Sequence, residues 1–181
     1  MKLKLNADQL RSLQPTAISL QTKKKLKKQE IYIILDNVLD TYNIGSIFRL
    51  ADAIAAKKLY LCGGTETPPN HKIKKASINT TEWVDWEYTE SASKVINDLR
   101  STINDIQVIA IEQTTKSIPY DKFDYKLPIA LVVGHESDGV SKEVLKMADA
   151  IVELPMFGVN ISLNVMVSLG IVLYEVIEKT V

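Results

Sequence analysis

Three short polar segments follow predicted strands, and their side chains are of types that bind phosphate, ribose or a small ligand. The first segment holds Asn43, Gly45 and Arg49. Asn43 is expected to cap a helix, and Arg49 lies six residues later on roughly the same side, where its guanidinium could hold a phosphate or a ribose. A capped helix with an arginine on its surface explains this segment equally well when it is taken alone.

The second segment runs from Gly134 to Gly139, after an apolar stretch and before a predicted helix. Such a turn can hold a ligand against backbone amides, although a tight turn without a ligand is the commoner case. It lacks the Gly-Lys-Ser/Thr of a phosphate-binding loop and the spacing of a dinucleotide fingerprint. Because His135 has no cysteine or second histidine near it, we interpret it as structural and expect no metal site.

The third segment joins an apolar strand that stops at Pro155 to an apolar helix, and it contains Ser162 and Asn164. Polar groups within so apolar a stretch need hydrogen-bond partners. Ser162 is expected to cap the last helix, while Leu154 and Leu163 are of the type usually found in a core. A loop of backbone amides and short apolar side chains would also suit an adenine ring.

The elements that position these segments alternate along the chain. Near-continuous Val, Ile and Leu runs interspersed with helical patterns predict an α/β fold whose parallel sheet is covered on both faces. Ligands bind beyond the carboxyl ends of such strands, so the three segments should converge on one site. Residues 65–82 are predicted to form a long loop. Strands are expected at residues 31–35, 58–62, 86–89, 107–111, 129–133 and 150–154, and helices at 44–56, 91–102, 141–148 and 162–179.

The 181 residues suit one domain with a sizeable core, and their formal net charge is zero. Cys62 is the only cysteine, so no intrachain disulfide forms. Neither a signal peptide nor a stretch long and apolar enough for a membrane span is visible. These features predict a cytoplasmic protein without a membrane segment.

Positive charge is concentrated near the start of the chain. Residues 1–30 hold eight Lys and Arg against two acidic residues, and we interpret them as a basic helical arm that could meet a polyanion. A second basic stretch, residues 68–75, precedes Trp83 and Trp86. Basic loops contact phosphates, and aromatic rings can stack on splayed bases. A solvated loop with at least one buried tryptophan is the simpler interpretation.

Taken together, the three segments resemble the signature motifs of the SpoU/TrmH family of RNA ribose 2′-O-methyltransferases, over residues 31–178. The resemblance implies a Rossmann-like methyltransferase domain at residues 31–181, in which roughly residues 130–181 form a deep trefoil knot. The matching positions are Asn43, Gly45, Arg49 and Ala51, then Gly134, Glu136 and Gly139, then Leu154, Pro155, Met156, Ser162, Leu163, Asn164 and Val165.

The same resemblance implies that S-adenosylmethionine is bound in the knot and that its methyl group goes to a ribose 2′-hydroxyl in transfer or ribosomal RNA. It also implies a homodimer through the last helix, with the first motif of one subunit near the cofactor of the other. The cofactor contacts would come from four positions, mostly through backbone atoms: Ile111, Gly134, Leu154 and Leu163.

The implied catalytic residues are five. Arg49 would act at the 2′-hydroxyl, and because a guanidinium is not deprotonated in proteins, we expect it to anchor phosphate and stabilise the developing alkoxide. Asn43 and Glu136 would position Arg49 and the ribose. Ser162 and Asn164 would order the loop and the pocket.

The chain departs from the family pattern at two places. Met166 and Ser168 stand where Ser and Ala are usual, and we expect local repacking there rather than lost activity. Residues 76–80 also differ from the common pattern, which leaves the choice of RNA open.

Two other functions are compatible with such a fold. An RNA-binding or ribosome-assembly protein that keeps the fold without catalysis is disfavoured by the intact motif residues. An enzyme with another nucleotide cofactor is disfavoured by the absence of nucleotide-binding fingerprints.

Overall fold

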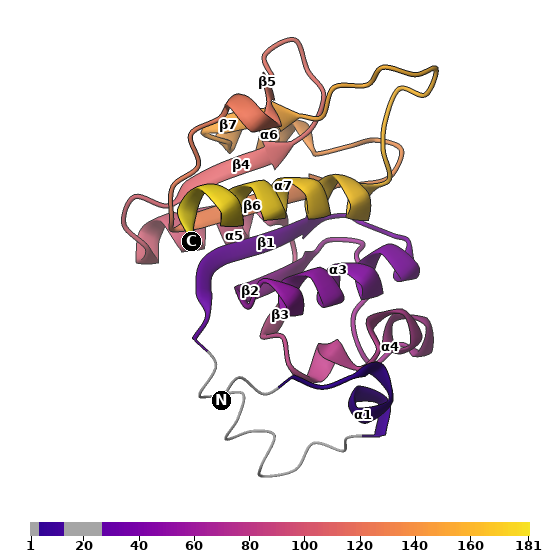
Figure 1. Ribbon diagram of the computed structural model, residues 1–181. Helices are drawn as coiled ribbons and strands as arrows, with labels where there is room; N and C mark the ends of the chain where they lie inside the picture. The colour runs from indigo at the N-terminus through magenta and orange to yellow at the C-terminus, as the bar shows by residue number, and fades with distance from the viewer. Residues whose placement is uncertain (1–3, 13–26) are drawn as a thin grey trace.

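The computed structural model describes residues 4–12 and 27–181 (Figure 1). Most of the predicted basic arm, including residues 23–26 of its lysine run, lies outside the described residues. Within the arm, α1 (Ala7–Ser12) is helical. None of the helices in the described ranges is long and apolar enough to cross a membrane.

A seven-stranded sheet forms the centre of the described chain, in the order β3-β2-β1-β6-β4-β7-β5. Each pairing between strands is parallel, which confirms the predicted α/β class. The two central strands β1 and β6 are almost wholly buried, as their unbroken apolar runs predict. The strands are β1 (Gln29–Asp36), β2 (Ala56–Cys62), β3 (Trp86–Thr89), β4 (Gln107–Ile111), β5 (Ile118–Pro119), β6 (Ile129–Gly134) and β7 (Ala150–Glu153).

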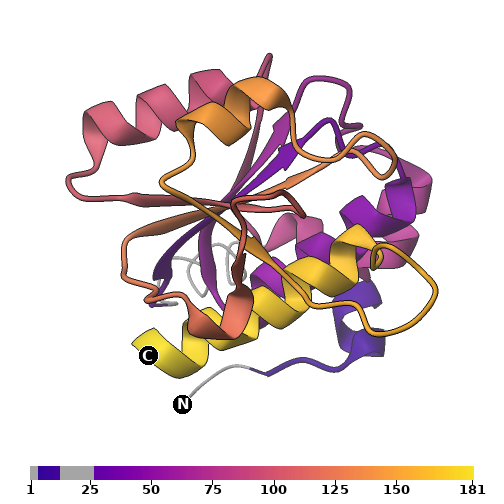
Figure 2. The same ribbon diagram turned by 90° about the horizontal axis from the view of Figure 1, so that it is seen from above.

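Helices cover both faces of the sheet, as Figure 2 shows from above. On one face, α3 (Thr41–Ala53) and α7 (Val165–Thr180) share a core with alternate residues of β1 and β6. On the other face, α5 (Ala92–Thr102) and α6 (Lys142–Met147) cover the intervening residues. This alternation follows from the two-residue period of a strand. The trefoil knot expected within residues 130–181 stays a prediction.

The prediction of a single loop over residues 65–82 is wrong. This stretch contains α4 (His71–Ser77) and the 3-10 helix η1 (Thr80–Glu82). Asn70 caps α4, since its side chain accepts hydrogen bonds from the N–H groups of Lys72 and Ile73 at 2.9 and 3.2 Å. Only seven residues long, α4 is too short to show a helical period in the sequence.

Two predicted helix caps are also wrong. The cap of α3 is Asp40, whose carboxylate accepts from the N–H of Tyr42 at 2.7 Å, and Asn43 lies inside the helix. The cap of α7 is Asn164, whose side chain accepts from Met166 N–H at 2.9 Å, and Ser162 lies before the helix. In both cases the expected residue is a good cap by type, and a neighbour with the same capacity takes the position.

Gly45 lets α4 pack directly on α3. A Cβ atom at this position would stand 2.6 Å from Cβ of Ala76 and 2.8 Å from the carbonyl oxygen of Ile73. The backbones of the two helices therefore approach more closely than any other residue at position 45 would allow. The glycine of the first motif thus has a structural reason, which is the attachment of α4.

The two tryptophans belong to the packed interior. Trp83 is buried, which confirms the expectation for at least one of them. Trp86 is partly buried and packs edge-on against Phe48, with ring centroids 6.3 Å apart. Neither ring has a fully exposed face on which a base could stack.

Candidate functional site

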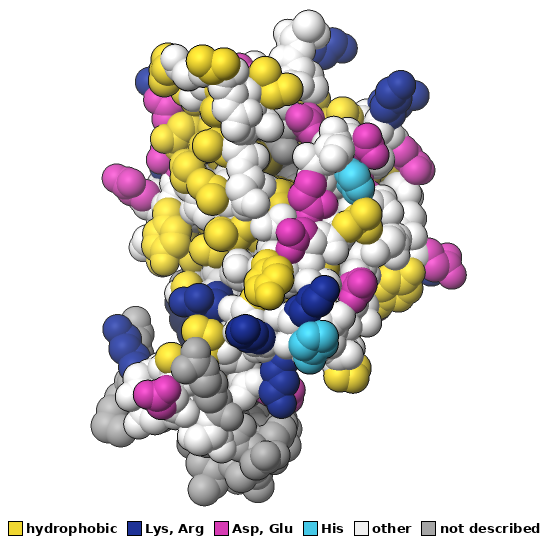
Figure 3. Space-filling model, turned by 90° about the vertical axis from the view of Figure 1, so that its right-hand side faces the viewer, with side chains coloured by type: hydrophobic (Ala, Val, Ile, Leu, Met, Phe, Trp, Pro, Cys, Tyr) yellow, Lys and Arg dark blue, Asp and Glu magenta, His cyan; other side chains and the backbone are white. Residues whose placement is uncertain are grey.

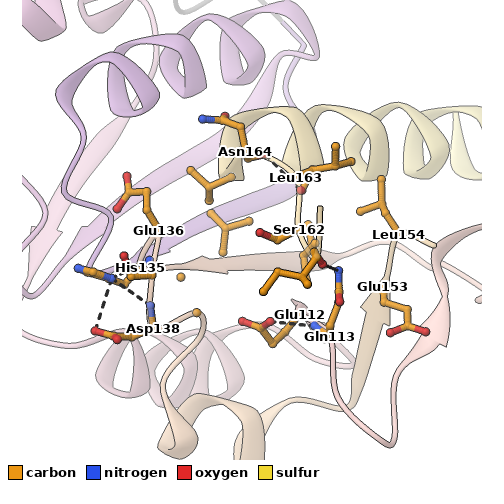
Figure 4. Close-up of a pocket in the computed structure, with 18 of the residues that line it drawn as sticks. Glu112, Gln113, His135, Glu136, Asp138, Glu153, Leu154, Ser162, Leu163 and Asn164 are labelled. Carbon is orange, nitrogen blue, oxygen red and sulfur yellow. Dashed lines mark hydrogen bonds and ion pairs between the residues drawn. The ribbon is translucent and has the colours of Figure 1, made fainter. Parts of the chain in front are cut away.

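A pocket with a volume of about 610 Å³ lies at the carboxyl ends of β4, β6 and β7 (Figure 4). Its walls come from residues 111–113, the turn at 133–139 and the loop at 153–165. In Figure 4, Glu136 and His135 lie on one side of the pocket and Glu153 and Leu154 on the other. Its size is that of a small-molecule site, and it lies where a parallel sheet places one.

Seven of the nine predicted site residues line this pocket. All four cofactor candidates are among them: Ile111, Gly134, Leu154 and Leu163. So are Glu136, Ser162 and Asn164. Asn43 and Arg49 do not line it, and the structure treats these two residues differently.

Asn43 is connected to the pocket by hydrogen bonds to two of its lining residues, Glu136 and Asn164. Its Nδ2 donates to Oε1 of Glu136 at 3.0 Å, and its Oδ1 accepts from Nδ2 of Asn164 at 3.0 Å. The backbone N–H groups of Leu39 and Asp40 also donate to the Glu136 carboxylate, at 3.1 and 3.0 Å. One residue from each of the three motifs therefore belongs to a single hydrogen-bond network.

The network sets the charge of Glu136. Desolvation raises the pKa of this carboxyl, but hydrogen bonds from the Asn43 side chain and from the N–H groups of Asp40 and Leu39 act in the opposite direction and prevail. The pKa of Glu136 is therefore below its ordinary value. At neutral pH this side chain is an ionised hydrogen-bond acceptor.

Arg49 is exposed on α3 and lies outside the pocket of its own chain. Within the described residues it makes no hydrogen bond or ion pair. The structure therefore does not bring Arg49 together with the other candidate residues, although α3 itself carries Asn43.

The turn at 134–139 explains both glycines of the second motif. A Cβ atom at Gly134 would overlap the backbone of Gly139 and Val140. Gly139 has a φ of +70°, and a Cβ there would overlap the Glu112 carboxylate. His135 closes the turn, because its Nδ1 accepts from the N–H groups of Ser137 and Asp138 at 3.1 and 3.2 Å, in agreement with a structural role.

Sequence reasoning missed Glu112 and Gln113, which connect the three walls of the pocket. Oε2 of Glu112 accepts from Val140 N–H at 2.8 Å, which attaches the turn after β6. Nε2 of Gln113 donates to the carbonyl oxygen of Ile161 at 2.8 Å, which attaches the loop before α7. Both residues directly follow β4 at its carboxyl end, and that position was the signal that could have identified them.

The pocket is acidic. Among its described lining residues are four carboxylates and neither a Lys nor an Arg. Apolar side chains complete the lining. Such a pocket favours a ligand with a positive charge and an apolar or aromatic part, and it disfavours a phosphate group. The carboxylates are Glu112, Glu136, Asp138 and Glu153, and the apolar side chains include Ile111, Leu154, Met156 and Leu163.

Within residues 4–12 and 27–181, no group of three His, Cys, Asp or Glu side chains could hold a metal ion. Ser168, one of the departures from the family pattern, lines the pocket and donates to the carbonyl oxygen of Asn164 at 3.2 Å. Its hydroxyl is accommodated within the first turn of α7.

Comparison with known proteins identifies one family. A sequence model of the SpoU rRNA Methylase family matches residues 30–174. A tRNA (guanosine(18)-2′-O)-methyltransferase of Aquifex aeolicus is 33% identical over 153 residues, which are 82% of this chain and 69% of that protein. The 23S rRNA (guanosine-2′-O-)-methyltransferase RlmB of Ralstonia nicotianae is 28% identical over 149 residues, 82% of this chain and 59% of that protein.

Solved structures agree with the sequence matches. The AdoMet-bound rRNA methyltransferase of Sinorhizobium meliloti has a TM-score of 0.76 at 29% identity, over 93% of this chain and 59% of that chain. The chain thus spans between 59% and 69% of the lengths of these three proteins.

Proposed function

The chain belongs to the SpoU rRNA methylase family, and on that premise we propose that it is an S-adenosylmethionine-dependent enzyme that methylates a ribose 2′-hydroxyl of RNA. The observation that carries the proposal is the pocket at the ends of β4, β6 and β7. Its lining includes the four cofactor candidates, and it also includes Glu136 and Asn164, which Asn43 joins by hydrogen bonds from outside the pocket. Relatives named for transfer and for ribosomal RNA support either of these as the substrate.

The pocket fits S-adenosylmethionine by its size and its charge. Its acidic lining complements a sulfonium and an amino group, and its apolar side chains suit an adenine ring. Gly134 and Gly139 also line it, in a turn too tight to hold a side chain at either position. The cofactor supplies a methyl group on a positively charged sulfur, which makes the methyl reactive without further activation. A phosphate-bearing cofactor would meet four carboxylates and, among the described lining residues, no Lys or Arg.

The residues of the network would position the substrate. Glu136 is held by three donors and stays ionised, so it can accept a hydrogen bond from a ribose hydroxyl. Its lowered pKa makes it a weak base, so its contribution is alignment rather than removal of the proton. Fixing the acceptor hydroxyl in line with the methyl group is the main requirement of such a transfer.

We propose that Arg49 acts in a homodimer, at the pocket of the partner subunit. The helix α7 presents an exposed apolar face of Val167, Ile171 and Tyr174, at the spacing of one helical side. The same helix packs on α3, since Leu50 lies 3.5 Å from the position of a Cβ at Gly170. A dimer through α7 would therefore carry α3 and Arg49 toward the second subunit.

There the guanidinium would anchor a phosphate and stabilise the alkoxide that develops at the ribose. Because its proposed substrates are cellular RNAs, we place the enzyme in the cytoplasm.

The test is transfer of labelled methyl groups from S-adenosylmethionine to separated transfer and ribosomal RNA that lack the modification. The variant is Arg49→Ala, and the control is Arg100→Ala, which removes an exposed arginine that pairs with Asp149 on the far side of the sheet. Label at a ribose of one RNA pool, lost with Arg49→Ala and kept with Arg100→Ala, is expected. No label in any pool, with cofactor binding shown by calorimetry, would favour a binding protein without catalysis.

A further inference from the structure

The proposed function requires a polyanion to approach an acidic site. The four carboxylates of the pocket repel the phosphates of an RNA, and its described lining residues include no Lys or Arg. RNA affinity comes largely from cations placed along the phosphate backbone. An RNA substrate must therefore be held by a surface outside the pocket.

The exposed side of α4 is such a surface. It presents four basic side chains, and the helix contains no acidic residue. None of the four forms an ion pair within the described residues. Figure 3 shows dark blue side chains gathered around a histidine, below a region with acidic and hydrophobic side chains. The carboxylate of Glu66, in the preceding loop, accepts a hydrogen bond from Asn70. The four residues are His71, Lys72, Lys74 and Lys75.

The helix that carries these basic side chains is fixed in place, so their Cα atoms are held at defined positions. Ile73 of α4 is fully buried, and Gly45 brings the helix into backbone contact with α3. Oγ1 of Thr80 donates to the carbonyl oxygen of Ser77 at 2.8 Å, which holds the end of the helix. A side-chain hydrogen bond of 3.0 Å from Asn79 to the carbonyl oxygen of Leu10 attaches the N-terminal segment to the same place.

The attachment connects the basic surface to the site. The helix α3 carries Asn43, which holds Glu136 and Asn164, and Gly45 lies only two residues further along that helix. The position of α4 relative to the pocket is therefore set by one rigid helix. A phosphate backbone held on α4 would be placed at a defined position relative to the network.

We propose that α4 is the surface that binds the phosphate backbone of the substrate RNA beside the methylated nucleotide. This inference rests on the proposed function for the identity of its ligand. Lys72 and Lys75 are three residues apart and therefore share a side of the helix. Lysine contacts with phosphates carry no base preference, so this surface accounts for affinity and placement, and the choice of sequence is made elsewhere.

The test compares two double charge reversals in the full chain. One is Lys72→Glu with Lys75→Glu on α4. The matched control is Lys142→Glu with Lys146→Glu, which changes the same charge on exposed lysines of α6, on the other face of the sheet. Affinity for unmodified RNA is measured by filter binding over a series of salt concentrations. Cofactor affinity by calorimetry and far-UV circular dichroism show that each variant is folded.

The α4 pair should weaken RNA binding at least tenfold, and the plot of log K against log salt should flatten by roughly 1.4 to 1.8, as expected for the loss of two phosphate contacts. The α6 pair should change neither quantity. Equal losses of RNA affinity for both pairs would mean that only net charge matters. Unchanged RNA affinity for the α4 pair would mean that this surface does not bind RNA, and an acidic protein partner would then be the alternative ligand. Either result overturns the inference.

The two proposals fail separately. If the wild type binds RNA through α4 but transfers no methyl group to any RNA, the surface stands and the catalytic proposal falls. If methyl transfer occurs and the α4 pair binds RNA as tightly as wild type, the enzyme stands and the surface falls.

Discussion

Asn43 and Asn164, 121 residues apart in the chain, are joined by a hydrogen bond of 3.0 Å between their side-chain amides. Each amide has a second function: Nδ2 of Asn43 donates to Glu136, and Oδ1 of Asn164 caps α7. The orientation of both amides is thereby determined, because each end of each group faces one kind of partner. A change of charge or of hydrogen-bond donor at position 43 should therefore disturb both Glu136 and the start of α7.

Asn43→Ala removes two side-chain hydrogen bonds, and a loss of about 1–3 kcal/mol in the free energy of unfolding is expected. Asn43→Asp should cost more activity than Asn43→Ala, since it sets a second carboxylate against Glu136 in place of a donor. Urea unfolding and the rate of methyl transfer measure the two effects. An Asn43→Asp variant as active as wild type would show that the network is dispensable.

The pH dependence of stability follows from Glu136. Its pKa is lowered in the folded chain, so its ionisation contributes stability above the unfolded value, roughly 4.3, and this contribution disappears as the pH falls through the folded value. Wild type should lose stability in this acid range relative to Glu136→Gln, which does not titrate. Chemical unfolding between neutral pH and the acid range provides the comparison. Parallel curves for the two proteins would contradict the assignment.

Gly45 and Gly170 form a matched pair of helical glycines. Ala is a better helix former than Gly by about 1 kcal/mol, so either substitution would stabilise an isolated helix. At Gly170 the new Cβ would have only ordinary contacts at 3.5 Å, and Gly170→Ala should raise the unfolding temperature. At Gly45 it would stand 2.6 Å from Ala76, and Gly45→Ala should destabilise the protein by about 1–3 kcal/mol. Thermal unfolding decides the sign, and the same sign for both would refute the close packing of α3 and α4.

Gln113 should hold the loop before α7 over the pocket. Gln113→Ala deletes its bond to Ile161, and the dissociation constant for S-adenosylmethionine should rise about two- to tenfold, as one hydrogen bond of 0.5–1.5 kcal/mol implies. Gln107→Ala is the control, since Gln107 lies at the other end of β4 and also bonds through its side chain, to Asp124 and Lys126. Calorimetry gives both affinities. Equal effects of the two changes would mean that the loop is held by other groups.

The sequence predicted the convergence of the three motifs because parallel strands place their carboxyl ends at one edge, and apolar runs identify the strands. It misassigned the caps because Asn43 and Ser162 are good caps by type, whereas the choice between neighbours depends on distant partners. The side chain of Asn43 is hydrogen-bonded to Glu136, 93 residues away, and Asp40 takes the N-cap position of α3. Such long-range competition has no local signal.

The helix α4 was missed for a different reason. Only two of its residues, Ile73 and Ser77, are buried, which is too few to show a helical repeat in the sequence. The helix also packs against Gly45 of α3, and a glycine gives no apolar signal. Glu112 and Gln113 were not predicted because a Glu-Gln pair is common in sequences. Their role depends on hydrogen bonds to Val140 and Ile161 in two distant loops. The exposed position of Arg49 agrees with one of the two interpretations that the sequence allowed, but a single chain does not show on which subunit the residue would act.

The order of the strands has a consequence for how the molecule comes into being. Strand β1 pairs with β6, at residues 129–134, so this pairing cannot form until those residues have been synthesised. The Asn43 network likewise requires Asn164. Contacts between such distant parts of a chain give a high contact order, and proteins of this kind fold slowly. On the ribosome, the binding pocket cannot form until the chain has been synthesised beyond Ser168, the last residue of its described lining. A nascent chain that ends before this point lacks the pocket, so we expect it not to bind the cofactor.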